Sequence, residues 1–151
     1  MRGDVLRGAL LGLGVLALYV WSGHYWIDLV DEGYFLDLAQ RVTQGAVPYR
    51  DFSTYYTPGI FGLFAAVMNV FGVALLPIRF VMAALHAVLA VLLYGLTRRV
   101  TPWPWALLPT LVVVALDHWP IEPEPHPSWP AIVACLATME LVARHHATCT
   151  A

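Results

Sequence analysis

Charged residues are scarce in this chain of 151 residues. They make up 12% of it, whereas an ordinary soluble domain has about 25%. The net charge is only -2, so the sequence lacks the basic footprint of a nucleic-acid-binding protein. The two cysteines, Cys135 and Cys149, are too few for a disulfide framework. No internal repeat and no low-complexity tract is present. These shortages exclude a nucleic-acid partner, a disulfide scaffold and a repeat array.

Apolar residues are abundant instead. They make up 60% of the chain, and the mean hydropathy is +0.68. The charges gather between long apolar runs, which is the layout of a multi-span membrane protein, so we expect an all-α polytopic fold. Five runs are candidate spans: Gly8–Trp21, Pro58–Pro77, Phe80–Thr97, Trp103–Leu116 and Trp129–Ala143.

The first run resembles a signal sequence only in part. Arg2 and Arg7 precede it, but the residues that follow it lack an A-x-A-like cleavage site. They carry aromatic side chains suited to a membrane interface. We therefore interpret it as an uncleaved first span.

The basic residues constrain the topology. If every run crosses the bilayer, Arg98, Arg99 and Arg144 lie outside, against the positive-inside rule. If the segment 58–73 instead lies along the outer surface, or dips in and returns, every basic cluster is cytoplasmic. The sequence therefore favours about four spans in the plasma or inner membrane, with a cytoplasmic N-terminus. The alternative stays open because Pro58–Pro77 is apolar enough to span.

The first outer loop is expected to contain two interfacial helices. From Gly33 to Gly45, apolar residues recur on one helical face, and Gly45 is a natural stop. Thr57 and Pro58 form an N-cap and a first-position proline, which predicts a second helix start. The proline-rich stretch PIEPEPHPSWP, residues 120–130, is expected to be an irregular loop.

The acids Asp31 and Glu32 open this loop at the outer end of the first span. Two neighbouring carboxylates near a low-dielectric boundary repel each other, so one pKa should rise. Such a pair suits a general base or a divalent cation, which would be the cofactor. A solvated loop start explains the same two acids.

Four further residues are candidates for binding substrate or phosphate. Arg50 offers a fork of donors to a phosphate, or it forms a surface pair with Asp51. Tyr55 and Tyr56 line a sugar or lipid groove, or they belong to an aromatic belt. Arg79 either binds a phosphate or reaches lipid headgroups.

Later residues offer a second set of candidates. His86 lies within a predicted span, where it is either functional or a packed side chain. Glu122, Glu124 and His126 lie in the proline-rich loop and would complete a site begun by Asp31 and Glu32. Their residue types also ligate metals.

The order of these pieces resembles the N-terminal part of the GT-C-type membrane glycosyltransferases. A first span leads to "DEG", an amphipathic helix ending at Gly45, "VPYRDF", "TPGIFGLFAAVMNVFG", and an arginine-led span ending in "LTRR". The pattern is most similar to the branch related to protein O-mannosyltransferases and lipid A aminoarabinose transferases. The resemblance covers nearly the whole chain and is most specific over residues 31–72.

The resemblance implies sugar transfer from a polyprenyl-phosphate donor at the outer face, by an inverting single displacement. Asp31 and Glu32 match the acid position that the family needs for transfer. Glu124 or His126 lies nearest to the place of a second acid, although no "DxP"-type acid is present. Because such enzymes have more spans, residues 1–151 are expected to form the N-terminal part of a larger membrane domain. The alternative is a non-catalytic membrane protein, such as a transport or assembly subunit or a truncated remnant of the enzyme.

Overall fold

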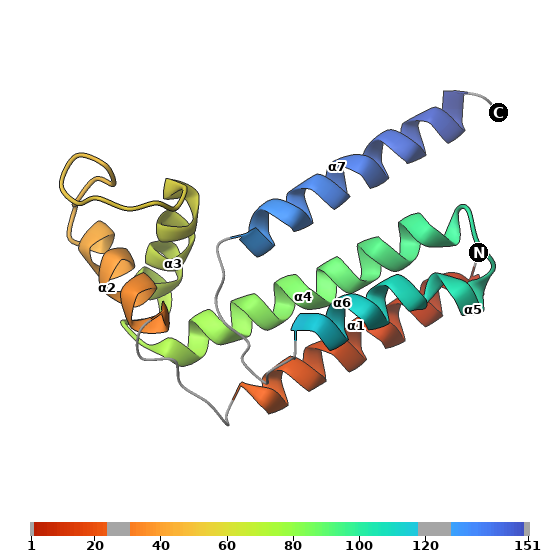
Figure 1. The fold of residues 1–151 in the computed structure, drawn as a ribbon, viewed down its shortest axis with the longest axis horizontal. Coiled ribbons are helices and arrows are strands. Elements are labelled where there is room, and N and C mark those ends of the chain that lie inside the picture. The colour runs from red at the N-terminus through yellow and green to blue at the C-terminus, as the bar shows by residue number, and fades with distance from the viewer. Residues whose placement is uncertain (1, 24–30, 118–127, 150–151) are drawn as a thin grey trace.

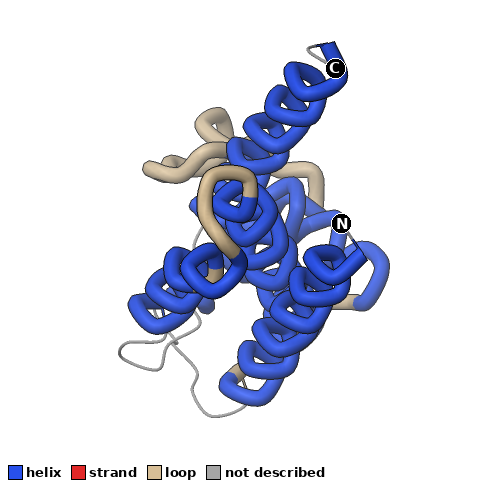
Figure 2. Tube along the Cα trace, turned by 90° about the vertical axis from the view of Figure 1, so that its right-hand side faces the viewer, coloured by secondary structure: helices blue, strands red, loops and turns tan. Residues whose placement is uncertain are grey.

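The computed structural model describes residues 2–23, 31–117 and 128–149. Within these ranges the chain is helical, with short loops and no strand (Figures 1 and 2). The all-α prediction is therefore confirmed. The helices are α1 (Arg2–Ser22), α2 (Asp31–Thr43), α3 (Pro58–Phe71), α4 (Leu75–Arg98), α5 (Trp103–Ala106), α6 (Leu108–Asp117) and α7 (Ser128–Cys149).

The long helix α4 forms the centre of the structure, and α1 runs antiparallel along it (Figure 1). Their close contact depends on small residues. A Cβ atom added to Gly12 would lie 2.7 Å from Cγ2 of Val91, so only glycine allows this approach. Further along the pair, Val15 and Tyr19 pack with Ala83 and Ala90 in a buried cluster. Glycine at the crossing thus lets the two helices bury side chains over most of their length.

The helices α2 and α3 form a separate hairpin at the N-terminal end of α4 (Figure 1). Phe35 and Leu38 of α2 are buried against Phe61 and Phe64 of α3, and the cluster continues to Ile78 of α4. The predicted amphipathic pattern of α2 is confirmed, because its polar residues Asp37, Gln40 and Arg41 are exposed, as is Gln44 directly after the helix. The apolar face, however, packs against α3.

The helix boundaries agree in part with the predictions. The end of α2 at Thr43 fits the predicted stop at Gly45, which has a positive φ of 94°. The start of α3 at Pro58 is also confirmed, but the side chain of Thr57 makes no capping hydrogen bond. The predicted irregular loop extends too far, because Ser128, Trp129 and Pro130 belong to α7. Proline fits there, since the first turn of a helix needs no N–H from it.

Two helices, α1 and α4, are long and apolar enough to cross a membrane. By contrast, α3 has 14 residues and is about 21 Å long, shorter than a hydrocarbon core of about 30 Å. The predicted span 103–116 is divided into α5 and α6 at Leu107, and α7 is less apolar than α1 and α4. Two of the four expected spans thus correspond to α1 and α4, and the other two remain a prediction.

Candidate functional site

A buried ion pair joins the two residues that the sequence placed at the outer end of the spans. Arg79 of α4 donates from Nε to Oε1 of Glu32 at 2.9 Å and from Nη2 to Oε2 at 2.6 Å. A third donor, Nη1, bonds the carbonyl oxygen of Gly23 after α1. The side chains of Glu32 and Arg79 are only 3% and 12% exposed. One arginine therefore fixes the start of α2 against the ends of α1 and α4.

The local sequence explains this arrangement. Glu32 lies in the first turn of α2, where a carboxylate is favoured by the helix dipole. Arg79 lies in the second turn of α4, and its planar fork matches the two carboxylate oxygens. The backbone of Asp31 begins α2 beside this pair, and the side chain of Asp31 lies outside the described part of the structure.

The space beside Arg79 is small. A cavity of about 10 Å³ is lined by Tyr19, Gly23, Leu76 and Arg79, among others. This volume holds about one water molecule and no sugar. The described residues therefore place an acid and an arginine together without enclosing a substrate.

The segment VPYRDF forms a compact turn. Arg50 bonds Asp51 through Nε and Nη2 at 2.9 and 2.8 Å, and the backbone N–H of Val47 donates to Asp51 at 2.7 Å. The Arg50 guanidinium and, secondarily, this N–H lower the pKa of Asp51 to about 2. The surface pair is thus the arrangement present, and Arg50 lies in the α2–α3 connection rather than beside Arg79.

The two neighbouring tyrosines have different environments. Tyr55 is fully exposed, whereas the ring of Tyr56 packs on Phe35 with 4.8 Å between centroids. The carbonyl of Tyr56 also accepts a hydrogen bond from the hydroxyl of Tyr49 at 2.6 Å. Tyr56 therefore helps to hold the hairpin, and only Tyr55 presents its whole ring.

A second polar cluster lies halfway along α4. His86 is buried, stacks on Tyr19 with 4.1 Å between centroids, and lies 4.5 Å from the ring of Trp129. Its Nδ1 donates to the carbonyl of Met82 at 2.8 Å, and its Nε2 lies 3.2 Å from Oδ2 of Asp117. The hydroxyl of Tyr19 donates to the same carboxylate.

Sequence reasoning considered His86 but missed its partners. Asp117 ends the apolar run LVVVALD, and a single acid at such a position was the signal that could have found it. Tyr19 follows Val15 by one helical turn, so it faces α4 as Val15 does. The contact with His86 needs the packing of three helices, which periodicity alone does not give.

The structure does not describe the two later residues that the sequence assigned to this site. Glu124 and His126 lie outside the described residues. Among the residues that are described, no group of three or more His, Cys, Asp or Glu side chains is placed to hold a metal ion. Both oxygens of Glu32 are already bonded to Arg79, and the positive charge of that arginine disfavours a cation at the same carboxylate.

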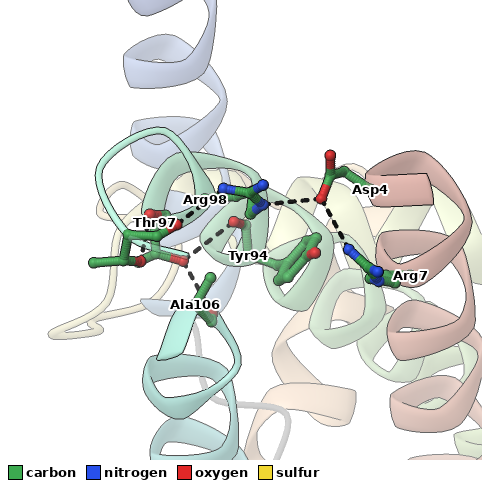
Figure 3. A network of polar contacts seen from close by, with 7 residues as sticks. Asp4, Arg7, Tyr94, Thr97, Arg98 and Ala106 are labelled. Carbon is green, nitrogen blue, oxygen red and sulfur yellow. Dashed lines mark hydrogen bonds and ion pairs between the residues drawn. The ribbon is translucent and has the colours of Figure 1, made fainter. Parts of the chain in front are cut away.

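The opposite end of α4 carries a basic network. Arg98 bonds Asp4 of α1 at 2.9 Å (Figure 3), and it also bonds the carbonyl of Thr101 at 3.0 Å. Arg99 and Arg144 both bond Glu140 of α7, at 2.7 and 2.8 Å. This network joins α1, α4 and α7 at the end remote from Glu32.

Comparison of the chain with protein-family models, with curated proteins and with solved structures found no match.

Proposed function

We propose that the chain is a multi-pass membrane protein in which α1 and α4 cross the bilayer antiparallel and α3 does not cross. The support is the pairing of their ends. Gly23 after α1 contacts Arg79 near the start of α4, and Asp4 at the start of α1 contacts Arg98 at the end of α4. A crossing by α3 would begin α4 on the wrong side for these contacts.

The dimensions and charges agree with this placement. Arg79 and Arg98 are 19 positions apart, about 29 Å along a helix, which matches a hydrocarbon core of about 30 Å. Five of the eight arginines lie towards the Arg98 end of α1, α4 and α7: Arg2, Arg7, Arg98, Arg99 and Arg144. The positive-inside rule then makes that end cytoplasmic and puts the α2–α3 hairpin outside.

At the outer end, the function that we propose is sugar transfer from a polyprenyl-phosphate donor. The carboxylate of Asp31 would take the proton of an acceptor hydroxyl as its oxygen bonds the anomeric carbon. The bond from that carbon to the lipid phosphate would break at the same time, and the polyprenyl phosphate would leave with inversion at the sugar. A lipid-linked donor has to be met at the membrane surface, where the hairpin would lie.

The observation that carries this proposal is the Glu32–Arg79 pair. It holds the acid-bearing start of α2 against the adjoining ends of α1 and α4, because Arg79 bonds both Glu32 and Gly23. Glu32 is then a positioning residue for Asp31, and Arg79 is the residue that holds Glu32 in place. Arg50 and Tyr55, in the exposed α2–α3 connection, would contact the donor headgroup or the acceptor.

The small cavity beside Arg79, about 10 Å³, limits what these elements do by themselves. A donor sugar needs a larger enclosure, which further helices or a partner would supply. We therefore expect no turnover from the purified 151-residue chain in liposomes that contain polyprenyl-phosphate sugar. Robust turnover there would show that the site opens without help.

The proposal is tested with Asp31→Asn in cells that express the gene from its own locus. The variant keeps the size of the side chain but cannot accept a proton, so transfer should fall about 10²–10⁴-fold. Donor binding should change little, because the lost interaction belongs to the transition state. Asp37→Asn, on the exposed face of α2, is the control. Normal transfer by an Asp31→Asn protein that is expressed and inserted would remove Asp31 from the mechanism.

A second candidate function is a non-catalytic membrane subunit for transport or assembly. The cluster of His86, Asp117 and Tyr19 favours it, since ionisable side chains buried between spans mark ion paths and helix assembly. His86→Gln and Asp117→Asn separate the two ideas. They should abolish activity in a transport subunit, whereas an outer transferase site, about 10 Å further along α4, should retain most of its turnover.

A further inference from the structure

At the basic end of the structure, α7 leaves α4 and α1 as it runs towards its C-terminus (Figure 1). A cavity of about 550 Å³ lies between these three helices. Its walls are apolar, with Val5 and Ala9 from α1 and Val91 and Leu92 from α4. Charged side chains from all three helices line it as well: Asp4, Arg98, Glu140 and Arg144. A cavity of this size is in the range of ligand sites, about 300–1,000 Å³.

The charged side chains that line this cavity balance each other, but the ion-pair network to which they belong carries an excess of positive charge. Asp4 and Glu140 are the acids, and they bond Arg7, Arg98, Arg99 and Arg144. Arg7 and Arg99 bond these acids from outside the cavity lining, so the network of four arginines and two acids has an excess charge of +2. Arg144 is also 70% exposed, so its guanidinium can turn towards a ligand at the rim. This cavity is therefore an apolar groove between the three helices, with the arginines Arg98 and Arg144 at its rim. Such a groove is complementary to an anionic amphiphile.

We propose that this cavity binds one anionic phospholipid, with its phosphate at Arg98 and Arg144 and its acyl chains along Val5, Ala9 and Val91. The proposal rests on the membrane placement above but not on sugar transfer. Anionic lipids are enriched in the cytoplasmic leaflet, which is where this end would lie. A lipid fits better than a free phosphate, because its acyl chains can pack against the apolar walls of the groove and a free phosphate has no apolar part.

Gly95 allows the groove to be filled without changing its charge. It lines the cavity, and a Cβ atom added there would meet nothing within 4 Å. Gly95→Leu therefore places a side chain in the lipid path, and its Cβ atom meets no neighbour. Gly14→Leu is the matched control, because Gly14 also has open space, lies on α1 and is not among the cavity residues.

The charge has a matched control as well. Arg144 pairs with Glu140 four positions earlier at 2.8 Å, and Arg41 pairs with Asp37 at the same spacing at 2.9 Å. Arg144→Gln and Arg41→Gln each remove one exposed arginine from such a pair. Only the first removes it from the groove.

The test is native mass spectrometry of the full chain released from nanodiscs of equal phosphatidylcholine and phosphatidylglycerol. We expect the wild type to retain phosphatidylglycerol in preference. Arg144→Gln should lower that preference about fivefold, the effect of one basic residue near an anionic surface. Gly95→Leu should lower the amount of retained lipid, and the Gly14→Leu and Arg41→Gln proteins should behave as wild type.

Several outcomes would overturn the proposal. Equal retention of the two lipids by the inserted wild type, or the same loss in Gly14→Leu as in Gly95→Leu, would remove the groove as a lipid site. Displacement of phosphatidylglycerol by glycerol 1-phosphate would replace the lipid with a soluble phosphate as the ligand. Insertion is measured first, by resistance to alkaline extraction. Extraction of the chain would contradict the proposed membrane placement. An inserted chain without lipid preference would contradict only the proposed lipid site.

Discussion

The pair of Glu32 and Arg79 should contribute more to stability than any exposed ion pair of the described chain. Glu32→Gln keeps the shape of the side chain but removes its charge, so the buried guanidinium of Arg79 loses its counter-ion. Breaking one partner of a buried pair costs about 3–5 kcal/mol. The amide oxygen of glutamine still accepts one hydrogen bond, so we expect a loss near the lower limit, about 3 kcal/mol.

The comparison is with the pair of Asp37 and Arg41 on the same helix. Their side chains are 58% and 53% exposed and 2.9 Å apart. Asp37→Asn should therefore cost only about 0.3–0.5 kcal/mol. The free energy of unfolding can be measured by titration with SDS in mixed micelles, followed by circular dichroism.

A double variant tests the physical reason. When Glu32→Gln is combined with Arg79→Gln, no unpaired charge remains, so the loss should be smaller than the sum of the single losses by about 1–3 kcal/mol. Additive losses, or a Glu32→Gln protein as stable as Asp37→Asn, would refute the reasoning. Either result would mean that water reaches the pair and screens it.

Three further predictions concern other parts of the chain. The first uses intact cells and a protein without the two native cysteines. An impermeant thiol reagent should label Tyr55→Cys, because Tyr55 is fully exposed, and it should miss Val100→Cys. Labelling of both variants would mean that α3 crosses the membrane. Gly12→Val should lower the free energy of unfolding in the same SDS titration by about 1–3 kcal/mol because its Cβ meets Val91, whereas Gly14→Val should be nearly neutral. The pKa of Asp51 is lowered from 3.8 to about 2, so its bonds stabilise the turn above about pH 4 and are lost as the pH falls through 2. Asp51→Asn should therefore loosen the turn at pH 6 and have no effect below pH 2, as measured by hydrogen exchange of the Val47 amide.

The helices were predictable where one local signal decided them. Gly45 and Pro58 marked helix ends, because glycine takes a positive φ and proline fits a first turn. The amphipathic pattern of α2 predicted which of its faces is buried. The pattern could not say what covers that face, since a bilayer and the Phe61–Phe64 face of α3 satisfy apolar side chains equally well. Hydrophobic burial is non-directional, so a partner is not encoded by one helix alone.

The candidate site was predictable only as a set of residue types. Asp31, Glu32 and Arg79 were chosen for their chemistry and for their place beside apolar runs. Their pairing was not predicted, because Glu32 and Arg79 are 47 positions apart and meet only when α1 and α4 lie antiparallel. Asp117 was missed for the same reason, since its contacts come from α1 and α4.

The antiparallel packing of α1 and α4 also determines which charged residues come together at each end of the structure. On the hairpin side, Arg41, Arg50 and Arg79 each bond one acid of their own, so no positive charge is left over. At the other end, Arg98, Arg99 and their neighbours share Asp4 and Glu140, and an excess remains. Paired charges attract neither a membrane surface nor a lipid headgroup strongly, whereas an unbalanced cluster attracts both. The excess of positive charge at this end would orient the spans in the membrane. It also places cationic side chains beside the large groove that α1, α4 and α7 enclose in the described structure.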